Sequence, residues 1–201
     1  MTIDTIVFDF GGVLIDWNPR HLFRKVFTNE SEMESFLSEI CTDEWNLEQD
    51  RGRTLSEGTA WLVEKFPAKA AWIKMYYDRW PEMLNGPISG TVDILARLKK
   101  HYPVYGLTNW SAETYPIALE RYEFLQWFDG ILVSGDEKLI KPDPAIFELL
   151  ATRFKIHPAS AVFIDDNIKN VDAAKQASFQ AIHFKSPQQL EEELNELGVA
   201  L

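Results

Sequence analysis

The sequence has a single cysteine and no long hydrophobic run, and each of these features excludes a class of protein. Cys41 is the one cysteine among 201 residues, so an intrachain disulfide cannot form and the chain suits a reducing compartment. Within residues 1–15, the apolar run covers only residues 6–8 before Asp9 interrupts it. That run is too short for a signal peptide or a membrane span, so we expect a soluble, cytoplasmic protein.

Basic residues are also scarce, which limits the partners that the chain can bind. Lys and Arg number 20 against 31 Asp and Glu, and the formal net charge is −11. Such a surface repels phosphate backbones and anionic lipid, so we expect neither nucleic acid nor a membrane as a partner. Hydrophobic residues make up 46% and charged residues 25%, as in globular proteins and unlike disordered chains. The sequence leaves open whether the protein is a monomer or a homodimer.

Five short apolar runs indicate a parallel sheet. They cover residues 5–8, 104–107, 131–133, 161–164 and 181–184. The runs are continuous rather than alternating, which is typical of strands covered on both faces. Helical patterns fall between the later runs. This alternation predicts an α/β fold with a doubly wound parallel sheet.

Residues 16–85 interrupt the alternation of strands and helices. This segment shows no convincing strand, holds five of the seven tryptophans, and ends at the turn sequence Asn85-Gly86-Pro87. We therefore expect a core domain of residues 1–15 and 86–201 and an inserted, all-helical domain of residues 16–85. The two points where the chain crosses between the domains would act as hinges.

Polar side chains follow the apolar runs, at the points where the predicted strands end. Asp9 follows the first run, Thr108-Asn109 the second and Asp165-Asp166 the fourth, and Lys141 lies in a loop after the third. In open parallel sheets, ligands bind outside the carboxyl ends of the strands. Three carboxylates, an ammonium and a hydroxyl/amide pair can together hold Mg²⁺ and a phosphoryl group, because Mg²⁺ prefers oxygen ligands.

These residues, in this order, resemble the motifs of the haloacid dehalogenase-like hydrolase superfamily. The motifs are Asp9-Phe10-Gly11-Gly12-Val13-Leu14, Thr108-Asn109, Lys141-Pro142 and Asp165-Asp166. The resemblance covers nearly the whole chain, including a helical insert after the first motif. It implies a hydrolase with a Rossmann-like core and a helical cap.

The resemblance also implies catalytic roles. Asp9 would be the nucleophile and form an aspartyl-phosphate intermediate. A carboxylate is a weak nucleophile that an anionic phosphate repels, so the metal and Lys141, bridging Asp9 and the phosphate, must offset this repulsion. The Thr108 hydroxyl and the Asn109 backbone N–H would bind the phosphoryl oxygens.

Mg²⁺ is the cofactor that the resemblance implies. Asp166 would bind it directly, together with an Asp9 oxygen and the backbone carbonyl of Gly11. Asp165 would be a further or water-mediated ligand. Asn170 would support this loop from behind the ligands.

Gly11 departs from the usual pattern of the superfamily's phosphatases, which place an aspartate there as general acid and then base. Glycine keeps the backbone carbonyl for the metal but has no proton to give, and loss of a general acid typically lowers a rate by about 10²–10⁴-fold. Either the substrate has a good leaving group, as in anomeric sugar, acyl or aryl phosphates, or a cap residue or water supplies the proton. The sequence is similar to a subgroup of sugar-1-phosphate phosphatases with glycine at this position, which favours a sugar phosphate.

Candidate substrate-binding residues come from the insert and from the loop after Asn109. Trp110 directly follows the phosphate-site pair and either walls the pocket or packs in the core. The stretch of residues 50–53 resembles the cap loop that faces the active site in relatives, with Gly52 permitting an unusual backbone conformation. The candidates from the insert are Trp17, Arg20, His21, Glu44, Trp45, Arg51 and Arg53.

The leading hypothesis is a Mg²⁺-dependent phosphatase of a small phosphorylated metabolite, and two other functions stay open. A 2-haloacid dehalogenase would use Asp9 to attack carbon and displace halide, with neither a metal nor an acid at Gly11. The Asp165-Asp166 pair is unexpected for such a metal-free site. A non-catalytic binding protein of the same fold is the second alternative, because Gly11 weakens the catalytic machinery.

Overall fold

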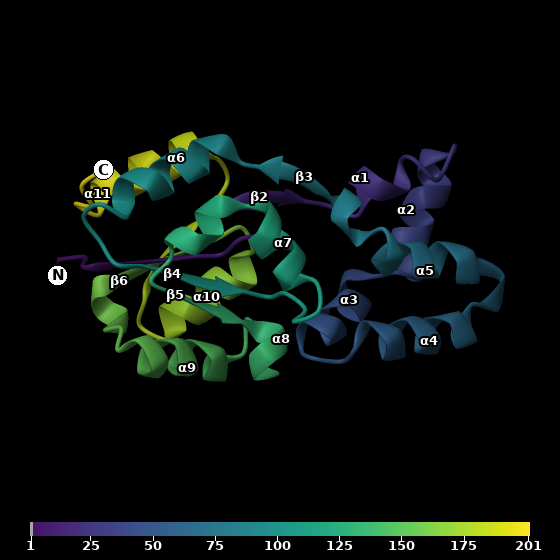
Figure 1. Cartoon of the computed structure of the whole chain (residues 1–201). Coiled ribbons are helices and arrows are strands. Elements are labelled where there is room, and N and C mark those ends of the chain that lie inside the picture. Colours follow the sequence, from purple (N-terminus) through teal and green to yellow (C-terminus); the bar gives the residue numbers. More distant parts are fainter. Residues whose placement is uncertain (1) are drawn as a thin grey trace.

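Five parallel strands form the sheet around which the larger of two lobes is built (Figure 1). In the computed structural model, which describes residues 2–201, the strand order is β5-β4-β1-β6-β7. The strands are β1 (Thr5–Phe8), β4 (Val104–Thr108), β5 (Gly130–Val133), β6 (Ala161–Asp165) and β7 (Gln180–His183). Each lies at one of the predicted apolar runs, so the parallel sheet is confirmed.

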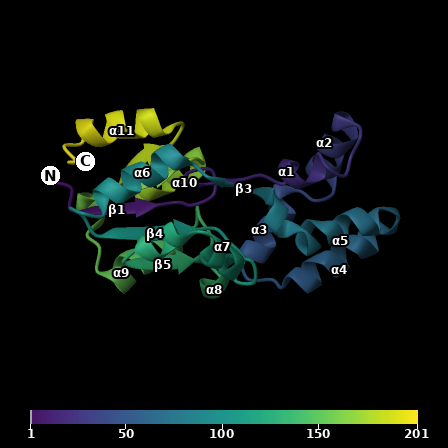
Figure 2. The same cartoon turned by 45° about the horizontal axis from the view of Figure 1, so that its top comes forward.

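Side chains of β1 alternate between two apolar layers. Ile6 and Phe8 pack in the layer that contains the helices Ser89–Leu98 and Pro187–Glu196, and Val7 packs in the layer that contains the helices Pro144–Phe154 and Ile168–Gln176. Helices therefore cover both faces of the sheet (Figure 2), which confirms the doubly wound α/β fold. The helices of this lobe are α6 (Ser89–Leu98), α7 (Tyr115–Arg121), α8 (Ser134–Glu137), α9 (Pro144–Phe154), α10 (Ile168–Gln176) and α11 (Pro187–Glu196).

Five helices form the smaller lobe, at the right of Figure 1, which we call the helical lobe. They are α1 (Arg20–Phe23), α2 (Glu30–Glu39), α3 (Asp43–Asp50), α4 (Leu55–Lys65) and α5 (Ala70–Asp78). Side-chain caps begin three of them: Asn29 caps α2, Thr42 caps α3, and Thr54 with Glu57 forms a capping box on α4. The core of the lobe is rich in aromatic rings, among them Phe23, Phe27, Phe36, Trp72 and Tyr76.

The expectation that residues 16–85 hold no strand is wrong at both ends of that segment. β2 (Ile15–Trp17) and β3 (Leu84–Pro87) pair antiparallel, with Asp16 opposite Gly86, and form a ribbon between the lobes (Figure 1). A strand of three residues is too short to show an alternating pattern, and Asn-Gly-Pro is a sequence typical of turns. Both chain crossings therefore lie in one hydrogen-bonded ribbon.

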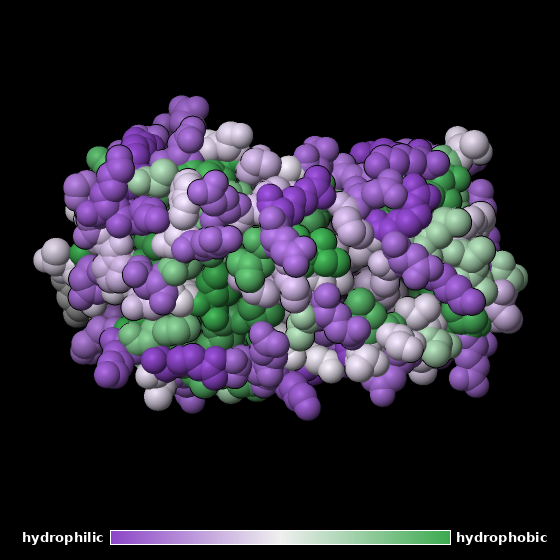
Figure 3. Space-filling view, in the orientation of Figure 1, coloured by the Kyte–Doolittle hydropathy of each residue, from purple (hydrophilic) through white to green (hydrophobic). Residues whose placement is uncertain are grey.

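The surface seen in Figure 3 is largely hydrophilic, and a shallow indentation separates the two lobes at the level of β2 and β3. Along residues 2–201, no helix combines the length and the apolar character that crossing a membrane requires. Two buried clusters hold the apolar side chains, and the larger of them continues from the sheet into the helical lobe.

Candidate active site

Three carboxylates meet at the carboxyl ends of two neighbouring strands. β1 and β6 pair in register, with Phe8 opposite Ile164. Asp9 and Asp165 are the residues that come directly after this pair, one on each strand. Asp166 is the next residue, and one carboxylate oxygen from each of the three lies within 4.8 Å of the others. The predicted acidic cluster is therefore assembled in the structure.

Gly12 lets Asp166 approach this cluster. Its φ is +74°, and a Cβ built on it would lie 2.2 Å from Asp166 Oδ2. Only glycine has neither the backbone strain nor the clash at this position. A Cβ on Gly11, in contrast, would meet nothing within 4 Å. The two adjacent glycines thus differ: Gly12 is required sterically and Gly11 is not.

The Lys141 ammonium is buried between two of the carboxylates. Its Nζ lies 2.9 Å from Asp9 Oδ1 and 2.7 Å from Asp165 Oδ2, and it donates a hydrogen bond to the Leu107 carbonyl at 2.9 Å. Burial by itself would lower the pKa of Lys141, but Asp165 and Asp9 raise it above its ordinary value. Lys141 is therefore a buried cation that contacts Asp9.

The carboxylates carry more negative charge than Lys141 neutralises. Three carboxylates and one ammonium leave a formal excess of two negative charges. Burial raises the pKa of Asp9 well above its ordinary value, Lys141 opposes that rise, and Asp165 and Asp166 add to it. Burial and Asp165 likewise raise the pKa of Asp166. Oxygen ligands with this charge excess fit a divalent cation such as Mg²⁺.

Asp165 is held by hydrogen bonds on both of its oxygens. Oδ1 accepts from the Asn167 N–H at 2.8 Å, and the Asn170 amide lies 3.0 Å from each oxygen. Lys141 occupies a further acceptor position on Oδ2. Asn170 comes from the first turn of α10, which Asn167 caps, so the helix N-terminus fixes both partners of Asp165.

The end of β4 supplies the next two predicted residues. Thr108 is the last residue of β4 and is buried. The Asn109 side chain holds the backbone of Lys141: Oδ1 accepts from the Lys141 N–H at 2.8 Å, and Nδ2 donates to the Lys141 carbonyl at 3.0 Å. We predicted a role only for the Asn109 backbone N–H, so this clamp is a new finding about Asn109.

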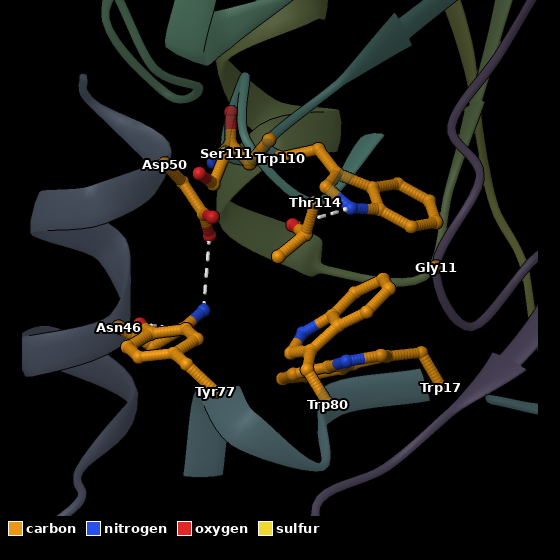
Figure 4. Close-up of a pocket in the computed structure, with 10 residues that line it drawn as sticks. Gly11, Trp17, Asn46, Asp50, Tyr77, Trp80, Trp110, Ser111 and Thr114 are labelled. Carbon is orange, nitrogen blue, oxygen red and sulfur yellow. Dashed lines mark hydrogen bonds between the residues drawn. The ribbon is translucent and has the colours of Figure 1, made fainter. Parts of the chain in front are cut away.

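A cavity opens between the two lobes beside these residues (Figure 4). Trp110, for which the sequence left a pocket wall and core packing open, lines the cavity and is also buried, with its indole N–H donating to Thr114 Oγ1 at 3.1 Å and its ring 5.6 Å from that of Trp80. Gly11 and Asn109 connect the cavity to the acidic cluster. The other lining residues are Trp17, Asn46, Asp50, Tyr77, Trp80, Ser111 and Thr114.

Of the substrate-binding candidates from the insert, Trp17 lines this cavity, whereas Arg20, Trp45 and Arg51 do not. Arg20 forms a bidentate ion pair with Glu34, at 2.7 and 2.6 Å. The buried Trp45 donates its indole N–H to the Gly58 carbonyl inside the helical lobe. Arg51 is exposed, 3.9 Å from a carboxylate on its own helical turn. All three side chains therefore make these polar contacts within the helical lobe.

Asp50 is one of several cavity residues that the sequence candidates did not include. It lies one position before Arg51, and its Oδ2 accepts from Asn46 Nδ2 at 3.1 Å. Burial raises the pKa of Asp50 to about 7, against the opposing effect of the Ser111 backbone N–H. The available signal was the stretch of residues 50–53, from which we chose the arginine rather than the aspartate.

The main chain of Asp50 is also joined to the sheet lobe. Ser134 Oγ donates to the Asp50 carbonyl at 2.6 Å and accepts from the Trp110 N–H at 2.9 Å. Ser134 is the first residue of α8, directly after β5, so one hydroxyl connects α3 to the ends of two strands. This connection sets the position of Asp50 opposite the strand ends.

Comparison with known proteins identifies the class of this protein. A family model described as haloacid dehalogenase-like hydrolase matches residues 3–178. The chain belongs to this family of hydrolases, and the family predicted from the motifs is confirmed. The matched segment contains all three carboxylates of the acidic cluster as well as Lys141.

Two of the relatives that cover most of the chain are phosphatases by name. A sesquiterpene phosphatase of Aspergillus oryzae is 25% identical over 90% of each chain. A D-ribitol-5-phosphate phosphatase of Bacteroides thetaiotaomicron is 21% identical over 89% of this chain and 90% of its own. A haloacid dehalogenase family enzyme of the same organism, crystallised with magnesium and inorganic phosphate, superimposes with a TM-score of 0.71 at 25% identity, covering 92% of this chain and 95% of its own.

Proposed function

We propose that this hydrolase is a Mg²⁺-dependent phosphatase of small phosphorylated metabolites, with a sugar phosphate as the favoured substrate. The observation that carries the proposal is the 2.9 Å contact between the buried Lys141 ammonium and Asp9, inside a cluster that Asp165 and Asp166 complete. A nucleophile, a cation and a set of oxygen ligands at a cavity mouth are the requirements for phosphoryl transfer to a carboxylate.

In this proposal Asp9 attacks phosphorus and forms the aspartyl-phosphate, which water then hydrolyses. Lys141 reduces the repulsion between the Asp9 carboxylate and the phosphate dianion, because it already contacts the attacking residue. The Thr108 hydroxyl and the Asn109 N–H, at the end of β4, bind phosphoryl oxygens. The Asn109 side chain keeps Lys141 in place while this happens.

The cofactor in this proposal is Mg²⁺, held by Asp166, an Asp9 oxygen and the Gly11 carbonyl. Asp165 serves as a further or water-mediated ligand, and its hydrogen bonds to Asn170 keep it oriented. When bound, Mg²⁺ neutralises charge on the carboxylates and on the phosphate, so that the two anions can approach each other.

The helical lobe acts in this proposal as a cap, residues 16–85, on a core of residues 1–15 and 86–201. Closure of the cap over the strand ends would exclude water and select the leaving group. The three tryptophans that line the cavity provide apolar faces of the kind that pack against a small ring. These aromatic walls support a compact metabolite, such as a sugar phosphate, over a macromolecular phosphate.

The test is phosphate release from a panel of esters: an anomeric sugar phosphate, an acyl phosphate, p-nitrophenyl phosphate and a simple alkyl phosphate. Each is assayed with Mg²⁺ and with a chelator, for the wild type, Asp9→Asn and Asp172→Asn. Asp172 is an exposed carboxylate on α10 and serves as the matched control. We expect release that requires both Mg²⁺ and Asp9 and is unchanged in Asp172→Asn.

Two results would contradict the proposal. Release of chloride from a 2-chloroacid without Mg²⁺, in place of phosphate release, would assign the chain to dehalogenation through Asp9. Absence of turnover of the phosphate esters and of the 2-chloroacid, with phosphate or vanadate still binding in a Mg²⁺-dependent way, would indicate a binding protein. Equal turnover of alkyl and anomeric phosphates would refute the preference for a good leaving group.

A further inference from the structure

The proposed phosphatase needs a proton donor for its leaving group, and Gly11 cannot supply one. Among the described residues that line the cavity, Asp50 is the one carboxyl group and Tyr77 the one phenol. Tyr77 is an unsuitable acid: burial raises its pKa further above the ordinary value, and its hydroxyl donates to Asn46 Oδ1 and accepts from Gln49 Nε2. Asp50 is therefore the group to consider.

Asp50 faces the cavity from the helical lobe, across from the strand-end loops (Figure 4). Its main-chain carbonyl, rather than its carboxyl, makes the 2.6 Å hydrogen bond to Ser134. The carboxyl itself accepts from Asn46 and takes part in none of the ion pairs found within residues 2–201. The backbone is thus fixed by one contact, while the acidic group is left facing the cavity.

We propose that Asp50 is the general acid and base of this enzyme, acting from the helical lobe in place of the residue missing at Gly11. The inference rests on the proposed phosphatase function. As Asp9 attacks phosphorus, the bond between phosphorus and the leaving oxygen breaks, and that oxygen takes its electron pair and the Asp50 proton to leave as a neutral alcohol. Water then attacks phosphorus of the aspartyl-phosphate and gives one proton to the Asp50 carboxylate. The bond between phosphorus and the Asp9 oxygen breaks with its electron pair on that oxygen, so hydrogen phosphate leaves and both residues return to their starting states.

The surroundings of Asp50 suit this role. Burial raises the pKa of Asp50 to about 7, opposed only by the Ser111 backbone N–H, so both protonation states are populated near neutral pH. The other titratable or charged groups around it come from three elements. Tyr76 and Tyr77 belong to α5. Arg51 and Arg53 follow α3, and their side chains contact Glu48 and Gln49 respectively. Lys138 follows α8 and packs against Gly52.

The test compares wild type and Asp50→Asn on phosphate monoesters whose leaving groups range from p-nitrophenol to a simple alkyl alcohol. kcat/KM is the quantity to compare, because it reports the step in which the leaving group departs. We expect Asp50→Asn to lower kcat/KM by about 10²–10⁴-fold for alkyl or sugar phosphates but by less than about tenfold for p-nitrophenyl phosphate, which needs no acid. Above about pH 7, wild-type kcat/KM for the alkyl ester should fall, and Asp50→Asn should lack this fall.

Asp43→Asn provides the matched control, because Asp43 is an exposed aspartate on the same helix, α3. It should retain the wild-type dependence on the leaving group and on pH. An equal loss by Asp50→Asn on every ester, or no loss on any, would overturn the assignment of Asp50 while leaving the phosphatase intact. Failure of the wild type to release phosphate from p-nitrophenyl phosphate would instead refute the proposed function itself.

Discussion

Asn109 holds Lys141 by its main chain, with one hydrogen bond to the N–H at 2.8 Å and one to the carbonyl at 3.0 Å. The two residues lie 32 positions apart in the sequence, so this pair connects the end of β4 to the loop that follows β5 and α8. The side chain of Lys141 then extends from this fixed backbone into the acidic cluster and contacts Asp9. The position of the ammonium thus depends on an amide that does not touch it.

The first prediction concerns this clamp. Asn109→Ala removes both hydrogen bonds, and we expect a loss of about 1–3 kcal/mol in the free energy of unfolding and at least a tenfold fall in kcat. The fall in kcat follows because the Lys141 ammonium is no longer held beside Asp9. Asn195→Ala, at an exposed position of α11, is the control and should change neither quantity. Urea unfolding and a phosphate-release assay measure both effects, and a wild-type kcat in Asn109→Ala would contradict the role of the clamp.

The second prediction uses two glycines with nearly the same φ angle. Gly12 and Gly198 have φ values of +74° and +76°, but a Cβ would clash with Asp166 only at Gly12 and would meet open space at Gly198. Both Gly→Ala variants should lose about 1–2 kcal/mol of stability from strain. Only Gly12→Ala should weaken Mg²⁺ binding, by at least tenfold, because Asp166 must move. Calorimetric titration with Mg²⁺ measures this, and equal affinities in the two variants would exclude Asp166 as a ligand.

Much of the sheet lobe was predictable from the sequence. Parallel strands buried on both faces need continuous apolar runs, and such runs are recognisable without a structure. The candidate active-site residues follow those runs directly, so the positions of Asp9 and Asp165 resulted from the strand prediction itself. β2 and β3 escaped prediction because a ribbon of three or four residues per strand carries no periodic signal.

The helical lobe was predictable in type but not in orientation. One residue along a helix turns a side chain by about 100°, so neighbours such as Asp50 and Arg51 face different surroundings. Which of them faces the cavity depends on how α3 packs against α4, α5 and α8, and no local pattern encodes that packing. Arg20 and Trp45 were chosen for their chemistry, and the structure uses them in an ion pair and in the lobe's own core.

The third prediction is a pH dependence of stability. The pKa of Asp50 rises from its ordinary 3.8 to about 7 on folding, so between these values the folded state binds more protons than the unfolded state. The contribution of Asp50 to the free energy of unfolding therefore falls as pH rises from 3.8 to about 7, by on the order of 2–4 kcal/mol. Asp50→Asn should lack this fall and be the more stable protein at pH 8, relative to wild type at the same pH. Urea unfolding at pH 5 and pH 8 measures the difference, with Asp43→Asn expected to follow the wild type.

The fourth prediction returns a carboxyl to the position where the superfamily's phosphatases usually have one. A side chain at Gly11 has open space in front of its Cβ, so Gly11→Asp introduces no contact closer than 4 Å at that atom. Asp50→Asn lacks the proposed proton donor for the leaving group. Adding Gly11→Asp to this variant should raise kcat/KM on alkyl phosphates by at least tenfold and should change kcat/KM on p-nitrophenyl phosphate little. Gly11→Asn in the same background has similar size without the proton and should recover nothing. Equal recovery by Gly11→Asn would show that the cavity needs volume at this position rather than an acid, because the two side chains differ in their ability to give up a proton and hardly at all in shape.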